Sequence, residues 1–151
     1  MDGTIPSIRN SGILGFLIIA LETTLETFTK VVLFTDTDGR AKFREEKIPL
    51  SEGTPQSMLS KLRPSTGYQI RFSPVGFRSE FHCTLIKQYV FILSGEMEIS
   101  LHDGTSRTFK PGGHFYCEDV VPEGTTFDPS IHGHWSRAVG NSPLVTLFVR
   151  A

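Results

Sequence analysis

The feature that most constrains the fold is a series of short apolar stretches separated by turns that contain glycine or proline. Several stretches alternate apolar and polar residues with the period of a β-strand, and Asp38-Gly39 and Asp103-Gly104 are typical hairpin turns. The predicted strands cover residues 31–34, 41–48, 68–72, 88–93, 96–101, 106–109, 114–118 and 144–149. Residues 51–64 are polar and hold two prolines, which predicts a loop with one helical turn. Short, regularly spaced strands indicate an all-β sandwich or barrel.

Length and charge limit the class of protein further. A chain of 151 residues forms one ordinary domain and buries roughly two-thirds of the surface that its unfolded state exposes. Its 15 basic and 16 acidic residues give no basic excess, so we expect no nucleic-acid partner. Secreted domains of this size usually carry several paired cysteines. The cysteines Cys83 and Cys117 therefore predict free thiols and a cytoplasmic location.

The amino-terminal residues 1–30 are interpreted as an extension of the main domain. Their apolar run, residues 12–21, is about half as long as a membrane-spanning helix requires, so we expect no membrane partner. A cleaved signal is disfavoured because the positive region is thin and no small-x-small cleavage site follows. Leu17, Leu21, Leu25 and Phe28 recur at helical spacing. The extension is predicted to be an amphipathic helix or a buried strand that covers the barrel or contacts a second subunit.

A set of motifs between residues 76 and 140 resembles the cupin superfamily. They are Gly76-Phe-Arg-Ser-Glu-Phe-His82, Gln88-Tyr-Val-Phe-Ile-Leu-Ser-Gly95, Pro111-Gly-Gly113, Glu118-Asp119 and His132-Gly-His134-Trp135. Gly76, His82, Gln88 and Gly95 fall on the spacing of the first cupin motif, and Pro111, Gly113 and His134 fit the second. The resemblance covers about residues 31–149 and implies a double-stranded β-helix, or jelly-roll barrel, as a cupin domain over residues 31–151.

More narrowly, the segment is similar to small single-domain cupins, including some encoded beside fungal polyketide pathways and labelled oxidoreductases. This resemblance implies a metal centre made of His82, Gln88 and His134, with zinc, iron or nickel as the ion. Thr84 stands where the family has its second histidine, and Gln88 stands where it has a glutamate. The ligand set is therefore incomplete, and a site that works without metal is the alternative.

Strand alternation places His114, Tyr116 and Glu118 on one face of their strand and Phe115 and Cys117 on the other. The pattern leaves open which face lines the barrel. If the first face is the inner one, an imidazole and a carboxylate share an apolar cavity and suit acid–base catalysis. We then expect His82, Glu118 and His134 to be catalytic, and Gln88, Tyr116 and Trp135 to bind the substrate.

The remaining polar residues are interpreted as structural or left open. We expect His102 to be exposed in the Asp103-Gly104 turn. We expect His114 to stabilise the turn that precedes it, at residues 111–113. His132 lies either on a surface loop or at the pocket mouth. Asp119 is an alternative to Glu118 as the inward carboxylate, and Arg137 is a candidate salt-bridge partner for either.

The predicted function is that of an enzyme that acts on an aromatic or polyketide-like small molecule. The reaction would be an isomerisation, dehydration or cyclisation, typical of isomerases and lyases of secondary metabolism, or a metal-assisted oxidation. The alternative from another class is a non-catalytic cupin that binds a small ligand. The resemblance also implies a homodimer that pairs through an amino-terminal strand.

Overall fold

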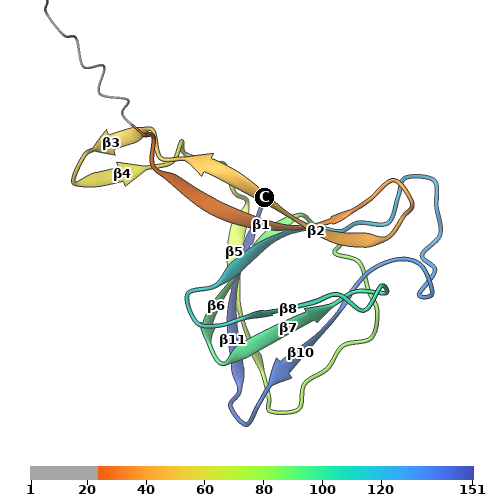
Figure 1. Ribbon diagram of the computed structural model, residues 1–151. Helices are drawn as coiled ribbons and strands as arrows, with labels where there is room; N and C mark the ends of the chain where they lie inside the picture. Colours follow the sequence, from red (N-terminus) through yellow and green to blue (C-terminus); the bar gives the residue numbers. More distant parts are fainter. Residues whose placement is uncertain (1–23) are drawn as a thin grey trace, which may run out of the picture.

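The computed structural model describes residues 24–151, which form eleven strands and no helix. The strands are β1 (Thr27–Thr35), β2 (Ala41–Pro49), β3 (Glu52–Thr54), β4 (Ser57–Leu59), β5 (Gly67–Ser73), β6 (Gln88–Ser94), β7 (Glu96–Ser100), β8 (Ser106–Phe109), β9 (His114–Glu118), β10 (Trp135–Val139) and β11 (Leu144–Arg150). Strands β1 and β2 form a long ribbon, and the β3–β4 hairpin extends away from the rest of the molecule (Figure 1). Among the described residues, no helix is long and apolar enough to cross a membrane.

Two sheets face each other. The larger sheet has the order β2-β1-β9-β6-β11-β5, in which only β1 and β9 run parallel among the paired strands of this part of the chain. The smaller sheet has the order β10-β7-β8. An irregular segment before β6 extends the smaller sheet beyond β10, through the bridges Arg78↔Arg137 and His82↔His134. This arrangement brings residues from the middle and the end of the chain to one place between the sheets.

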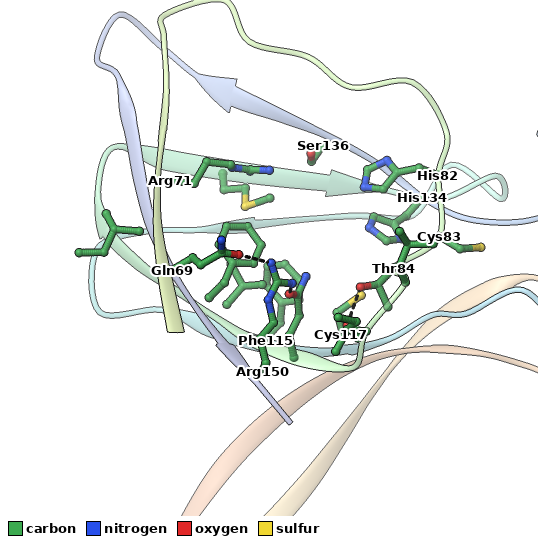
Figure 2. Close-up of a pocket in the computed structure, with 17 residues that line it drawn as sticks. Gln69, Arg71, His82, Cys83, Thr84, Phe115, Cys117, His134, Ser136 and Arg150 are labelled. Atoms are coloured by element: carbon green, nitrogen blue, oxygen red, sulfur yellow. Dashed lines mark hydrogen bonds between the residues drawn. The ribbon is translucent and has the colours of Figure 1, made fainter. Parts of the chain in front are cut away.

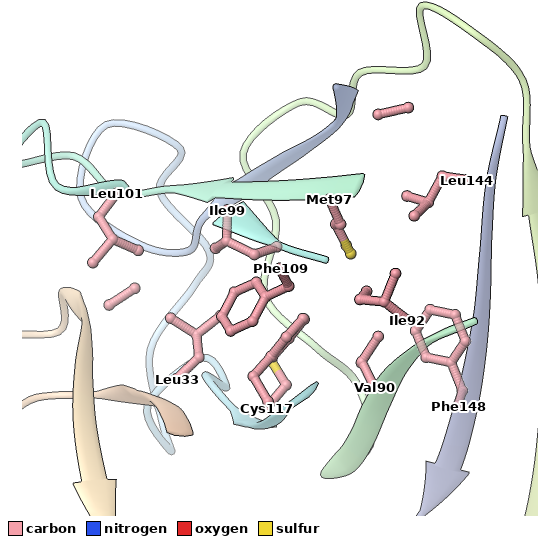
Figure 3. Close-up of a cluster of buried hydrophobic side chains, with 13 residues drawn as sticks. Leu33, Val90, Ile92, Met97, Ile99, Leu101, Phe109, Cys117, Leu144 and Phe148 are labelled. Atoms are coloured by element: carbon pink, nitrogen blue, oxygen red, sulfur yellow. The ribbon is translucent and has the colours of Figure 1, made fainter. Parts of the chain in front are cut away.

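The core fills the space between the sheets (Figure 3). Each strand contributes alternate residues to it, as the period of two requires. Val90 and Ile92 of β6 and Met97 and Ile99 of β7 are buried, as is Phe115 of β9. Further buried members are Leu33, Ala41, Leu101, Phe109, Cys117, Ala138, Leu144 and Phe148. The inner face of β9 is therefore the one that carries Phe115 and Cys117.

Most predicted strands are confirmed, with ends that shift by a few residues. The helical turn predicted within residues 51–64 is wrong, because the short hairpin β3–β4 occupies this region. Of the two alternatives for residues 1–30, a helix or a strand, the strand holds at Phe28, which pairs with Ile48 in β1–β2, while residues 12–21 lie outside the described residues. Strand β10 was not predicted. Both cysteines are free thiols, as predicted.

Candidate active site

A cavity of about 550 Å³ opens between the two sheets (Figure 2). Its apolar wall includes Val90, Met97, Phe115 and Phe148, and its polar side chains come from β5, β6, β10, β11 and the segment before β6. The polar lining residues are Gln69, Arg71, His82, Thr84, Gln88, His134, Ser136 and Arg150. An apolar pocket with a few convergent polar groups is the usual form of a small-molecule site.

His82 and His134 are brought together by direct pairing of their backbones. Each donates its N–H to the carbonyl oxygen of the other, at 2.9 and 3.0 Å, and their ring centroids lie 4.7 Å apart. Gly133 allows this approach, because a Cβ at its position would lie 2.5 Å from the His82 carbonyl oxygen. Its φ of +84° is also one that favours glycine. The Gly-His dipeptide therefore sets the spacing of the two imidazoles.

A buried carboxylate orients His134. Asp119, the residue directly after β9, is fully buried, and its Oδ2 lies 2.7 Å from Nδ1 of His134. Its other oxygen accepts a hydrogen bond of 2.8 Å from the Thr35 hydroxyl. An ionised carboxylate only accepts hydrogen bonds, so Nδ1 of His134 carries a proton. Neutral His134 therefore has its lone pair on Nε2, and the carboxylate stabilises the imidazolium that forms when Nε2 takes a proton.

His82 has the same tautomer for a different reason. Its Nδ1 lies 2.9 Å from the carbonyl oxygen of Glu80, which only accepts hydrogen bonds, so Nδ1 donates. Burial of the ring by surrounding protein lowers the pKa of His82, although the side chain is exposed at the cavity mouth. The Glu80 hydrogen bond opposes this shift, and the charges of His134 and Arg71 add to it. His82 therefore favours the neutral form, with Nε2 as a base.

Two arginines line the cavity. Arg150 donates hydrogen bonds to the side-chain oxygens of Gln88 and Gln69, the latter at 2.7 Å. The Arg71 guanidinium lies over Phe148 and Phe77, 4.9 and 5.2 Å from the ring centroids. Its Nε and Nη2 are buried and have no hydrogen-bond partner in the described part of the chain. Burial lowers the pKa of Arg71.

The two thiols at the cavity are poor nucleophiles. Cys83 and Cys117 both line it, and burial raises the pKa of each thiol to about 12. The thiolate is the reactive form of cysteine, and it is scarce at neutral pH when the pKa is this high. The reactive groups of this cavity are therefore its imidazoles.

Comparison with known proteins gives matches to solved structures alone. No protein-family model matches the sequence, and no curated protein matches it. Among solved structures, the chain is similar to the DMSP lyase DddQ from Ruegeria pomeroyi DSS-3, with 24% identity over 65% of this chain and a TM-score of 0.41. The match spans 42% of the lyase, less than half of its length. The Schizosaccharomyces pombe Cnp3 cupin domain is similar over 83% of both chains, with 17% identity and a TM-score of 0.43.

The fold is assigned from the arrangement of the strands in this structure. Two facing sheets enclose a cavity, and the two motif histidines meet inside it. The chain has a cupin fold. The all-β class predicted from the strand pattern and the jelly-roll architecture implied by the resemblance are therefore confirmed, while the link to fungal polyketide pathways stays a prediction.

The structure places half of the predicted site residues at the cavity. His82, Gln88 and His134 line it together. Glu118, Tyr116 and Trp135 do not line it, and expecting them there was wrong. Inward packing of Phe115 and Cys117 turns Tyr116 and Glu118 to the opposite face of β9.

Each of these three residues has other contacts. Glu118 pairs with Arg44 at 2.5 Å, Tyr116 packs against Tyr89 with ring centroids 4.7 Å apart, and the Arg78 guanidinium lies 4.1 Å from the Trp135 ring centroid. These contacts give the three residues structural roles outside the cavity. Asp119, weighed as the alternative to Glu118, is the carboxylate that reaches a motif histidine.

The other polar residues pack against structural neighbours, although the buried Nε2 of His114 has no hydrogen-bond partner in the described part of the chain. His102 is half-buried and stacks on Phe81, with ring centroids 3.8 Å apart, so the expectation that it is exposed was wrong. His132 is buried and accepts a hydrogen bond from the Asp128 backbone N–H. His114 begins β9 and is half-buried beside Phe28, and Arg137 pairs with Glu98 rather than with Glu118 or Asp119.

The predicted metal centre does not fit these residues. Within residues 24–151, no group of three or more histidine, cysteine, aspartate or glutamate side chains is arranged to hold a metal ion. The Gln88 side-chain oxygen, the predicted third ligand, is occupied by Arg150. The Thr84 hydroxyl donates to the carbonyl oxygen of Ile86 at 2.7 Å. Catalytic zinc sites usually have three protein ligands, and this cavity offers two imidazoles.

Sequence reasoning missed the two arginines. In β5, Gln69 and Arg71 line the cavity, whereas Tyr68 and Phe72 are 71% and 65% exposed. The alternation was correctly interpreted as a strand, but no inner face was assigned to it, so Gln69 and Arg71 were not considered for the site. A β5 strand with polar residues facing inward is the signal of a polar cavity that could have identified Arg71.

Proposed function

We propose that this cupin is an enzyme that transfers a proton within a small organic substrate. The reaction class is an isomerisation, dehydration or cyclisation. The observation that carries the proposal is the Asp119–His134 pair, in which a fully buried carboxylate lies 2.7 Å from Nδ1 of an imidazole at the cavity wall.

The step assigned to His134 follows from its tautomer. Nε2 takes a proton from a carbon or hydroxyl of the substrate, and the electron pair of the broken bond stays on the substrate. The Asp119 carboxylate stabilises the imidazolium without taking the proton itself. In an isomerisation or cyclisation, Nε2 then returns the proton to another atom of the substrate. In a dehydration, the electron pair forms the new double bond as the C–O bond breaks, and Nε2 gives the proton to the departing hydroxyl group, which leaves as water.

His82 is assigned a supporting role. Its lowered pKa favours the neutral form, so Nε2 accepts a hydrogen bond from the substrate and does not repel the imidazolium at His134. The 4.7 Å between the ring centroids lets one small molecule contact both rings. The apolar wall with Phe115 and Phe148 supports the proposal of a flat, aromatic substrate body.

Exchange of carbon-bound hydrogen with solvent tests the proposal. Aryl ketones and aryl keto acids are incubated with the protein in D₂O, and deuterium uptake beside the carbonyl group is followed by NMR. We expect at least one compound to exchange faster with the wild type than with His134→Gln. The matched control Glu118→Gln, which removes a carboxylate on the opposite face of β9, should retain the full rate. Equal rates for the wild type and His134→Gln across the whole set would overturn the proposal.

The same measurement distinguishes an enzyme from the non-catalytic alternative. A binding cupin would hold a compound of this set, detected by shifts of its NMR signals, without accelerating its exchange. General acid–base catalysis usually contributes about 10²- to 10⁴-fold, so the two outcomes are well separated.

A further inference from the structure

The cavity carries positive charge that no acidic side chain in its lining balances. Arg71 and Arg150 are the charged residues among those that line it in the described part of the chain, and neither aspartate nor glutamate lines it there. Asp119 lies behind His134 and is engaged by the imidazole and by Thr35. The partners of Arg150 are the neutral amides of Gln69 and Gln88, which do not cancel its charge.

Arg71 is the guanidinium with unmet hydrogen-bonding capacity. Its Nε and Nη2 are buried and unpaired among the described residues, in contrast to the amide-bound Arg150. Buried polar groups in native proteins normally have partners, and a charged group left without one is costly. The side chain extends from β5 toward the part of the cavity where Ser136 and His82 lie (Figure 2).

From this arrangement we infer that the substrate is an organic acid, with one carboxylate that pairs with Arg71 and an apolar body against Phe115 and Phe148. This inference rests on the proposed function, because it assigns a substrate class to the same cavity. Carboxylates suit a guanidinium because the planar group offers several N–H donors in a fixed fork. The pair would fix the acid at one end while its reacting carbon faces the imidazoles.

Recognition of an acid also requires that the positive charge of Arg71 is not paired with a carboxylate of the protein. A carboxylate side chain beside Arg71 would satisfy the guanidinium but compete with an acidic ligand. Stacking against Phe148 and Phe77 instead holds the group without neutralising it. The cavity therefore keeps a cation available at the cost of stability in the ligand-free protein.

Benzoate and benzamide form the probe pair, because they share a shape and differ in charge. Their dissociation constants are measured by calorimetry and by titration of amide NMR signals. We expect benzoate to bind the wild type at least tenfold more tightly than benzamide. Arg71→Met should lose most of this preference, because the amide-bound Arg150 is then the remaining cation of the lining in the described residues, while benzamide binding stays unchanged. Arg71→Lys should retain part of the preference, since it keeps the charge but loses the planar fork.

Two further variants control the experiment. Arg78→Met removes an equal charge from the outer surface at Trp135 and should leave benzoate binding unchanged. His134→Gln should lose proton exchange but still bind benzoate, which separates failure of the substrate assignment from failure of the proposed function. Arg71→Met should melt at the same temperature as the wild type or higher, because it removes an unpaired buried charge.

Three results would overturn the inference. The first is an equal preference for benzoate over benzamide in the wild type and in Arg71→Met. The second is a wild type that binds neither compound. The third is a loss of affinity in Arg71→Met that follows a loss of folded protein, which would give Arg71 a structural role.

Discussion

Substitution of Gly133 by alanine perturbs the contact that positions both imidazoles. A Cβ at this position would lie 2.5 Å from the His82 carbonyl oxygen and 2.7 Å from its carbonyl carbon. Because real Cβ contacts essentially never fall below 3.0 Å, the two backbones must separate by about 0.5 Å or more. The hydrogen bonds of 2.9 and 3.0 Å between His82 and His134 lie across this contact and lengthen with it.

The cost has two parts. A residue with a Cβ in the left-handed region costs roughly 1–2 kcal/mol, and forcing extra volume into a packed site costs about 1–3 kcal/mol more. For a chain of this size, about 3 kcal/mol corresponds to a decrease of ~10 °C in the melting temperature. Because a misplacement of about 1 Å can lower a rate ~100-fold, the exchange reaction should also slow by about one to two orders of magnitude.

Gly104→Ala is the matched control. Gly104 has a φ of +85°, against +84° for Gly133, but nothing lies within 4 Å of the point that a Cβ would occupy there. The Gly104→Ala variant should therefore show only the conformational cost of a left-handed alanine. We expect its melting temperature to fall by ~3–6 °C and its activity to be unchanged. Calorimetric melts, hydrogen exchange of the His82 and His134 amides and the D₂O assay measure the difference. If the two variants melt at the same temperature and retain the same activity, the assignment of Gly133 as the spacer is wrong.

Further expectations concern the carboxylates, pH and subunit assembly. Asp119→Asn should slow proton exchange by about 10²-fold or more and shift the imidazole ¹⁵N signals, because the amide cannot stabilise an imidazolium; unchanged kinetics would contradict the role of the pair. Burial lowers the pKa of both His82 and His114 below 6.5, so the unfolded chain binds more protons than the folded one and stability should fall as the pH decreases from about 6.5. Chemical denaturation at pH 7.5 and 5.5 checks this sign, and His82→Gln should reduce the pH dependence. The homodimer that pairs through an amino-terminal strand stays a prediction; sedimentation of the wild type checks it, and a monomer would refute it.

The fold was predictable because its signals are local. Alternating strands, Asp-Gly turns and motif spacing each act over a few residues, and together they specified most strands of both sheets. Strand β10 was missed because its sequence, Trp-Ser-Arg-Ala-Val, lacks a continuous apolar pattern. Its Ser136 and Ala138 are nevertheless buried, since small side chains fit where the segment before β6 packs against the strand.

The site was only partly predictable because it depends on which face of a strand is buried. Alternation divides β9 correctly into two sets of residues, but only packing between the sheets selects Phe115 and Cys117 as the inner set. The Asp119–His134 contact joins residues 15 positions apart through the end of one strand and the start of another. Arg71 was missed because an inward-facing charge on a strand contradicts the usual preference for apolar interiors.

The amide at position 88 helps to set the charge of the cavity. Gln88 accepts a hydrogen bond from Arg150, and because its amide is neutral, the positive charge of Arg150 is not cancelled. A glutamate there, as the cupin motif normally has, would place a negative charge against Arg150 and neutralise it. A one-residue exchange would thus reduce the uncompensated positive charge of the chamber from two guanidinium groups to one, that of Arg71, so the glutamine sets how strongly the cavity attracts acids.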